Sequence, residues 1–151
     1  MTYLLDTHCW LWLKTDASRL PSPLRRRLLR QPADLVLSSV CVMELVIKQS
    51  TGKLSLGAGG TRQFVAELID DGVSTLEAGV EHMLRMELLP PRHRDPFDRL
   101  LVAQAMVEGV AAVDSGEGPA PEPAPAEQGQ VVSDVMQVTV SRLMNEPVEA
   151  R

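Results

Sequence analysis

The sequence predicts an α/β fold in which a parallel β-sheet is flanked by helices in α-β-α layers. The first observation is the opening run Tyr3–Leu5, which is apolar and has no helix cap before it. Such a run is typical of a strand buried on both faces of a parallel sheet. The second observation is that short apolar runs alternate with segments of helical periodicity as far as Val113, which favours a parallel sheet.

The boundaries of the elements follow from capping and breaking residues. Ser22-Pro23 and Asp95-Pro96 each read as an N-cap followed by a first helical residue, and Ser38 or Ser39 can cap a third helix. The expected strands are Tyr3–Leu5, Leu35–Leu37, Val73–Leu76 and Val110–Val113. The expected helices begin with Cys9–Leu13 and continue with a helix from Ser22-Pro23 to Pro32, Val40–Gln49, a helix capped by Thr61 that ends at Asp70, Ala78–Leu88, and a helix from Asp95-Pro96 to Gly109.

Trp10 and Trp12 fall on different sides of the first helix, so at least one of them is expected near the surface or an interface. The helix that starts at Ser22-Pro23 carries four arginines, which form either a solvated face or a phosphate-attracting edge beside an acidic site. The arginines are Arg25, Arg26, Arg27 and Arg30.

Composition narrows the class of protein. The 151 residues fit one domain with a real core, and 44% hydrophobic with 23% charged residues is ordinary for a soluble chain. A net charge of −5 argues against a protein that coats nucleic acid, and 3% aromatics argue against base stacking, but neither argues against a nuclease with an acidic metal site. Cys9 and Cys41 read as reduced core residues, and no signal peptide or membrane helix is recognisable, so the expected location is the cytoplasm.

The composition changes at Ser115. Residues 1–114 form the predicted domain, whereas residues 115–130 are rich in Pro, Ala and Gly and are expected to be a linker. Residues 131–151 form an irregular tail in which Val138–Val140 could be a strand.

Asp6 directly follows the opening strand. A carboxylate after a buried strand is costly unless it is compensated, and the carboxyl ends of strands are where α/β sheets bind ligands. Asp6 is therefore a predicted site residue on which other carboxylates converge. The alternative is a helix N-cap, and the two roles are compatible because a capping carboxylate can also face a metal.

Three other carboxylates occupy positions that call for a structural or functional explanation: Glu44, Asp95 and Asp98. Glu44 is the only acid in a very apolar helix, and an i,i+4 pair with Lys48, worth about 0.2–0.5 kcal/mol, hardly justifies its burial. Asp98 stands three residues after the cap Asp95, so both acids have a capping alternative at this helix start. Asp114 follows the last predicted strand as Asp6 follows the first.

Carboxylates that face one another repel unless a cation holds them. Hard oxygen ligands suit Mg²⁺, with Mn²⁺ as an alternative, and such ions generate hydroxide nucleophiles and stabilise phosphoryl displacement. The acids therefore predict a metal site, in which Asp6 and Asp114 project from strand ends and Glu44 and Asp98 come from the helices beside them.

Three motifs together resemble a known family. They are Leu-Leu-Asp6-Thr-His, then Ser-Ser-Val-Cys-Val-Met-Glu44-Leu-Val-Ile-Lys with Gly52-Lys-Leu after it, and His-Arg-Asp95-Pro-Phe-Asp98-Arg-Leu-Leu-Val-Ala-Gln-Ala. In this order and spacing they resemble PIN-domain proteins, and more narrowly the VapC toxins of bacterial toxin–antitoxin pairs, over about residues 1–113.

The resemblance implies a PIN-like fold and a Mg²⁺-dependent endoribonuclease that is held inactive by a VapB-type antitoxin and commonly dimerises. Asp6, Glu44 and Asp98 match the family's first three metal-site acids, so the resemblance implies that they are the catalytic and metal-binding residues. Asp95 matches an extra Asp of this subgroup and is, with Asp114, a weaker candidate for the metal. The family's last acid normally follows a strand as Thr-x-Asp. Here an ungapped alignment puts Gly116 at that acid and Asp114 where the Thr should be.

Four functional hypotheses follow. The first is the metal-dependent ribonuclease, and the second is a catalytically impaired PIN protein that acts only by binding an antitoxin or RNA. A phosphatase of the haloacid dehalogenase type also places Asp after its first strand, but its chemistry needs a second Asp two residues on, where His8 stands. A structural domain without a site leaves Glu44 unexplained.

Overall fold

The computed structural model describes residues 2–89 and 95–113 and contains one four-stranded sheet in the order β3-β2-β1-β4. All neighbouring strands are parallel, with Tyr3 paired to Leu35 on one side and to Ala111 on the other. The strands are β1 Tyr3–Leu5, β2 Leu35–Ser38, β3 Ser74–Leu76 and β4 Ala111–Val113. The predicted α/β class and its parallel sheet are confirmed.

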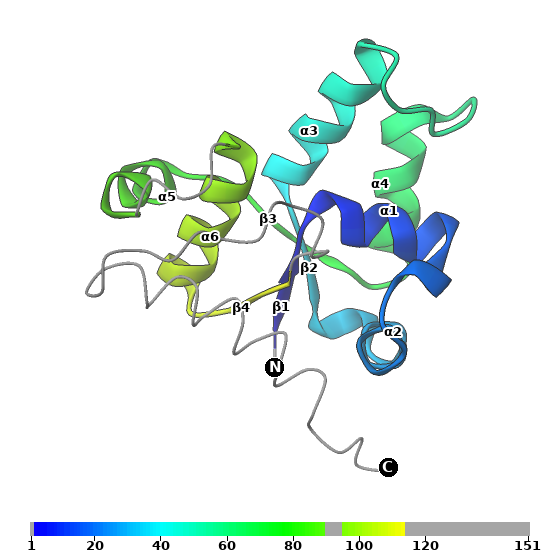
Figure 1. The fold of residues 1–151 in the computed structure, drawn as a ribbon, viewed down its shortest axis with the longest axis horizontal. Coiled ribbons are helices and arrows are strands. Elements are labelled where there is room, and N and C mark those ends of the chain that lie inside the picture. The colour runs from blue at the N-terminus through cyan, green and yellow to red at the C-terminus, as the bar shows by residue number, and fades with distance from the viewer. Residues whose placement is uncertain (1, 90–94, 114–151) are drawn as a thin grey trace.

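Helices cover both faces of the sheet, as the predicted three layers require. Figure 1 shows α5 and α6 on one side of the strands and α1, α2 and α4 on the other. The α-helices are α1 Thr7–Thr15, α2 Ser22–Arg30, α3 Ser39–Ser50, α4 Gly60–Asp70, α5 Val80–Arg85 and α6 Pro96–Glu108. Short 3₁₀ turns follow α1, α2 and α5 at Ala17–Arg19, Pro32–Asp34 and Met86–Leu88. No helix in the described ranges is long and apolar enough to cross a membrane.

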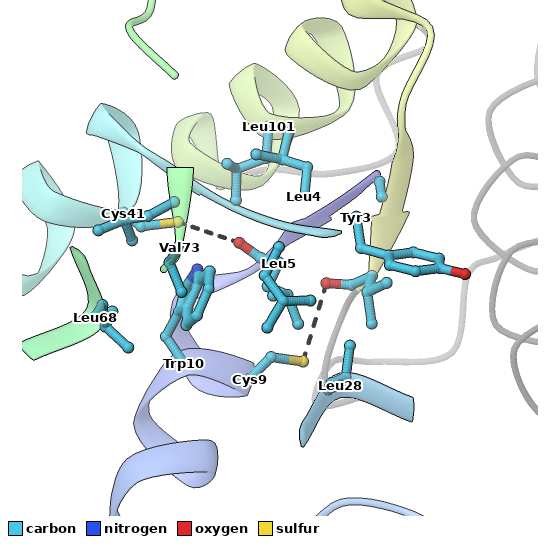
Figure 2. Packing of buried hydrophobic residues seen from close by; sticks show 14 of the residues in the cluster. Tyr3, Leu4, Leu5, Cys9, Trp10, Leu28, Cys41, Leu68, Val73 and Leu101 are labelled. Atoms are coloured by element: carbon cyan, nitrogen blue, oxygen red, sulfur yellow. Dashed lines mark hydrogen bonds between the residues drawn. The ribbon is translucent and has the colours of Figure 1, made fainter. Parts of the chain in front are cut away.

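Strand β1 is the centre of the core, because its residues are buried on both faces. Leu4 points toward Leu101 of α6, whereas Leu5 points toward Cys9 and Trp10 of α1 (Figure 2). This alternation is the two-residue period of a strand, and burial on both sides explains why the run reads as continuously apolar.

Some local expectations are wrong. Trp10 and Trp12 are both buried. Trp10 lies in the core, whereas the guanidinium of Arg19 lies 4.4 Å from the centre of the Trp12 ring and covers it. Thr61 does not cap α4, which begins one residue earlier. Its hydroxyl donates instead to Gln49 Oε1 of α3 at 2.8 Å.

Helix α2 packs near the start of β1, since the Arg27 guanidinium lies 5.7 Å from the centre of the Tyr3 ring. In Figure 1 this helix lies at the opposite end of the strands from the start of α3. The arginines of α2 therefore do not flank the acidic edge, and the solvated-face interpretation fits them better.

Residues 114–151 lie outside the described part of the chain. The predicted boundary at 114, the linker at 115–130, the tail at 131–151 and the acid Asp114 fall there and stay predictions. What the fold does fix is that the parallel strands bring Leu5, Ser38, Leu76 and Val113 to one carboxyl edge of the sheet.

Candidate metal site at the carboxyl edge of the sheet

Asp6 occupies the carboxyl edge at the centre of the sheet. Its carboxylate accepts a hydrogen bond from the Cys9 backbone N–H at 2.7 Å and caps α1. Its own backbone N–H donates to the Val113 carbonyl at 2.9 Å, which ties it to the end of β4. The capping role is therefore real. A carboxylate has about four lone-pair positions on its two oxygens, so capping a helix does not by itself prevent it from binding a cation.

Glu44 is buried on α3 and is joined to the segment that carries Asp6. The Thr7 hydroxyl donates to Glu44 Oε2 at 2.5 Å, and Thr7 directly follows Asp6. On the other oxygen, Lys48 Nζ lies 2.7 Å from Glu44 Oε1. The i,i+4 pair with Lys48 thus exists, but it is one of two interactions that hold a carboxylate aimed at the end of β1.

The thiol of Cys41 lies within the electrostatic influence of both carboxylates, Asp6 and Glu44. Its thiol donates to the Leu5 carbonyl, with sulfur and oxygen 3.4 Å apart (Figure 2). Burial is the main cause that raises the pKa of this thiol from 9.0 to about 12, against a hydrogen bond with Thr7. The negative charges of Asp6 and Glu44 raise the pKa further, so the two acids converge around one buried side chain.

A second buried polar pair fixes the start of α3. The Ser38 hydroxyl accepts from the Val40 backbone N–H at 3.0 Å and donates to Gln104 Oε1 of α6 at 2.5 Å. Ser38 rather than Ser39 is thus the cap of α3, and both Ser38 and Gln104 are fully buried. The pair holds α3, which carries Glu44, against α6, which carries Asp98.

Asp95 and Asp98 lie at the start of α6. Asp95 is exposed and caps the helix by accepting from the Phe97 backbone N–H at 2.8 Å, which confirms its capping role. Asp98 is partly buried in the first turn. Because α6 leads into the start of β4, its first turn lies toward the carboxyl edge of the sheet, as Figure 1 shows. Asp98 therefore belongs to the same end of the molecule as Asp6 and Glu44.

The donor chemistry of this edge suits a hard divalent cation, because the residues on offer are carboxylate oxygens. The structure brings Asp6 and Glu44 together through Thr7 and Cys41. Within residues 2–89 and 95–113, however, no three Asp, Glu, His or Cys side chains are grouped so that they would hold one ion. The participation of Asp98 stays a prediction, and Asp114 lies outside the described residues.

Sequence reasoning did not single out Thr7 or Gln104. Both had a recognisable signal: Thr7 is a polar residue directly after Asp6 at the start of an apolar helix, and Gln104 is the one polar residue within the buried run from Leu100 to Ala105. Buried polar groups need partners, so each of them indicates a hydrogen bond to another element.

The structure is thus that of an α/β protein with a parallel sheet and acids at the carboxyl edge of that sheet, and comparison with known families makes the class specific. The PIN domain family model matches residues 3–118, so the chain belongs to the PIN domain family. PIN domains are generally metal-dependent nucleases. No match was found among curated proteins.

Two solved structures share the fold. One is a DNA-bound VapBC from Salmonella typhimurium, with 18% identity, a TM-score of 0.53, and coverage of 76% of this chain and 86% of the other. The second is VapBC2 from Rickettsia felis bound to a DNA fragment from their promoter. It has 15% identity, a TM-score of 0.57, and coverage of 75% and 86%. At these identities the likeness concerns the fold.

Proposed function

We propose that this protein is a VapC-type endoribonuclease that uses Mg²⁺ to cleave RNA phosphodiester bonds and is neutralised by a VapB-type antitoxin. The observation that carries the proposal is the hydrogen bond from Thr7 to Glu44, which ties Glu44 to the residue after Asp6, at the end of the central strand of a PIN fold. Carboxylates that gather at one edge of a sheet repel each other, and a divalent cation offsets that repulsion.

Each acid has a role in the proposal. Asp6, Glu44 and Asp98 hold the ion, for which Mn²⁺ can substitute, and Thr7 orients Glu44. When bound, a divalent ion supplies an activated water and stabilises the charge of the transferring phosphoryl group. Asp95 serves α6 as its cap. Asp114 is a further ligand candidate near the position where the family has its last acid.

The test is cleavage of RNA by the purified protein. We expect cleavage with Mg²⁺, none after EDTA, and a loss of at least about a hundredfold in rate for Asp6→Asn. Asn is as good an N-cap as Asp, so this change removes a metal ligand while it preserves the start of α1. Asp95→Asn is the matched control, because it makes the same change at a cap and is expected to keep activity.

Two outcomes would contradict the proposal. One is cleavage that persists without any divalent ion. The other is an Asp6→Asn protein that cleaves as fast as the Asp95→Asn protein.

The second candidate is a catalytically impaired PIN protein that acts only by binding an antitoxin or RNA. The specific observation in its favour is Gly116, which stands where the family has its last acid. Tight binding of a VapB-type partner, together with no cleavage of any RNA at high protein concentration, would establish this candidate in place of the first.

The structure offers apolar surface for protein partners. Val80, Met83, Leu84 and Leu88 are all at least half exposed on α5 and the turn after it. Met43, Val46 and Ile47 form a second exposed group at helical spacing on α3. Large apolar residues gathered on one surface are typical of interaction sites. We propose that such surfaces serve the VapB-type antitoxin, consistent with the VapBC neighbours, and a homodimer.

Co-expression with a VapB-type antitoxin followed by light scattering would test both partners, and a strictly monomeric protein that binds no antitoxin would refute them. We also propose a cytoplasmic location, because the proposed substrate is RNA. Cys9 and Cys41 are free thiols, which fits a reducing compartment.

A further inference from the structure

Lys48 is the counterion of Glu44 in the structure. Its ammonium nitrogen lies 2.7 Å from Glu44 Oε1, while the Thr7 hydroxyl takes Oε2 at 2.5 Å. Both oxygens of a buried carboxylate are therefore engaged, one by a neutral hydroxyl and one by a positive charge. The two donors differ in their exposure to solvent: Thr7 is fully buried, whereas the Lys48 side chain is 29% exposed.

This difference predicts what each donor does when a divalent ion arrives. The Thr7 hydroxyl is neutral and fixed, so it can keep its bond and hold Glu44 in place. The Lys48 ammonium carries the same sign of charge as the ion and would be repelled by it. Its flexible four-carbon stem can carry the ammonium into solvent, because lysine readily extends its charge to water.

We propose that Lys48 is a built-in competitor for the metal: it neutralises Glu44 in the metal-free protein and must be displaced when the ion binds. Lys48 is thus a positioning residue that acts through Glu44. The inference rests on the proposed metal site at Asp6 and Glu44, and it adds that the chain itself lowers the affinity of that site.

The proposal predicts two effects of opposite sign from one substitution. Lys48→Met keeps the apolar stem but removes the charge, so Glu44 is left with one donor. The metal-free protein should then unfold at lower urea concentration than the wild type. Metal binding should instead become tighter, by roughly two- to fivefold in Kd, which is the range expected for a partly exposed ion pair.

The experiment titrates the chelator-treated full chain with Mn²⁺ and follows the electron paramagnetic resonance of the free ion. Urea unfolding is measured in parallel without metal. Lys48→Gln is the second variant, because it keeps a hydrogen-bond donor for Glu44 without a charge and protects the test if the Met variant folds poorly. Lys48→Arg keeps the charge and should bind Mn²⁺ no tighter than the wild type.

Lys14→Met is the matched control. Lys14 also forms an ion pair, with Asp71 Oδ2 at 2.7 Å, but that pair joins α1 to the residue after α4 and its carboxylate is more than half exposed. The same substitution there should leave the affinity for Mn²⁺ unchanged.

The outcomes separate this inference from the proposed function. Tighter Mn²⁺ binding by the Met and Gln variants, lost again when Asp6→Asn is added, supports the inference. If the wild type binds Mn²⁺ and the Met and Gln variants bind it with equal or lower affinity, the inference is overturned while the proposed metal site stands. If neither the wild type nor any Lys48 variant binds Mn²⁺, the proposed metal site fails and the inference fails with it.

Discussion

At the scale of single residues, Thr7 is the side chain that joins the opening strand to Glu44. Replacement by Val keeps its shape but leaves Glu44 Oε2 without its 2.5 Å donor. An unsatisfied buried acceptor costs about 1–3 kcal/mol, so we expect Thr7→Val to lose about that much free energy of unfolding. Urea denaturation measures the loss.

Thr7→Ser retains the hydroxyl and is the control for this prediction. It should recover most of the stability that Val loses. A Val variant as stable as the Ser variant would mean that the hydrogen bond to Glu44 has no net value.

Cys41 gives a prediction about pH. Its pKa is raised from 9.0 to about 12, mainly by burial, so the folded protein keeps a neutral thiol at pH values where the unfolded chain carries a thiolate. The contribution of this thiol to stability is therefore complete below pH 9.0 and is lost as the pH rises toward about 12.

The corresponding measurement is alkylation by iodoacetamide at pH 8.5, with Cys41 and Cys9 distinguished by peptide mapping. Thiolate is the reactive form, so we expect Cys41 to react at least about a hundredfold more slowly in the native protein than in urea. Equal rates in the two states would refute the assignment of Cys41 as a shielded neutral thiol.

At the scale of elements, the start of α3 depends on Ser38. Its hydroxyl both caps the helix and donates to Gln104, whereas the Ser39 hydroxyl accepts from the exposed Ala78 backbone N–H at 2.9 Å. Loss of a cap costs about 1 kcal/mol, and the orphaned buried amide of Gln104 adds to this. We expect Ser38→Ala to destabilise the protein by about 2 kcal/mol in thermal or urea unfolding.

Ser39→Ala is the neighbouring control and should cost less than half as much, because its bond is at the surface. If the two variants were equally stable, the cap and the contact with α6 would not be what anchors α3.

Helix α3 shows which structural details could be predicted from the sequence and which could not. Composition and spacing predicted α3 within about a residue, but they left Ser38 and Ser39 equivalent as caps. The choice is made by Gln104, which lies 66 positions away in the chain. The tryptophans were misjudged for a similar reason. Helical periodicity predicted that at least one of Trp10 and Trp12 lies near the surface or an interface, but the Arg19 that covers Trp12 comes from the turn beyond the helix.

The candidate site could be predicted where a residue contradicts its surroundings. Asp6 after a buried strand and Glu44 within an apolar helix were such contradictions, and the structure brings these two together. Asp98 did not stand out in this way, because an acid in the first turn of a helix is already explained by the helix dipole. The geometry of Lys48 and Thr7 around Glu44 was beyond sequence reasoning, since it depends on how β1 and α3 pack.

At the scale of the whole molecule, the strand order β3-β2-β1-β4 explains why the acids meet where they do. From β1 the chain builds the sheet outward to β3 and then crosses to place β4 on the other side of β1. Ligands of open α/β sheets bind at the carboxyl edge where the order reverses in this way. That point lies between β1 and β4, where the Asp6 N–H bonds to the Val113 carbonyl.

The topology leads to a prediction about the fourth acid. Gly116 follows Val113 by three residues and lies outside the described part of the chain, but a chain of that length spans at most about 11 Å. We therefore predict that a side chain at this position can reach the edge that Asp6 occupies. Gly116→Asp would restore the family's last acid and add a carboxylate ligand. We expect Mn²⁺ to bind about tenfold more tightly, with a matching rise in the rate of RNA cleavage.

Gly118→Asp is the matched control, because it adds the same charge two residues further along. If the added carboxylate acts only by long-range electrostatic attraction, both variants should bind Mn²⁺ more tightly to the same extent. High salt should then screen the attraction and remove the gain in affinity. Direct ligation by residue 116 would favour the Gly116→Asp protein at every salt concentration, and the gain would disappear when Asp6→Asn is combined with it. Equal affinities for the two variants would mean that the missing acid is not what limits this site, and that Asp114 or another group already takes its place.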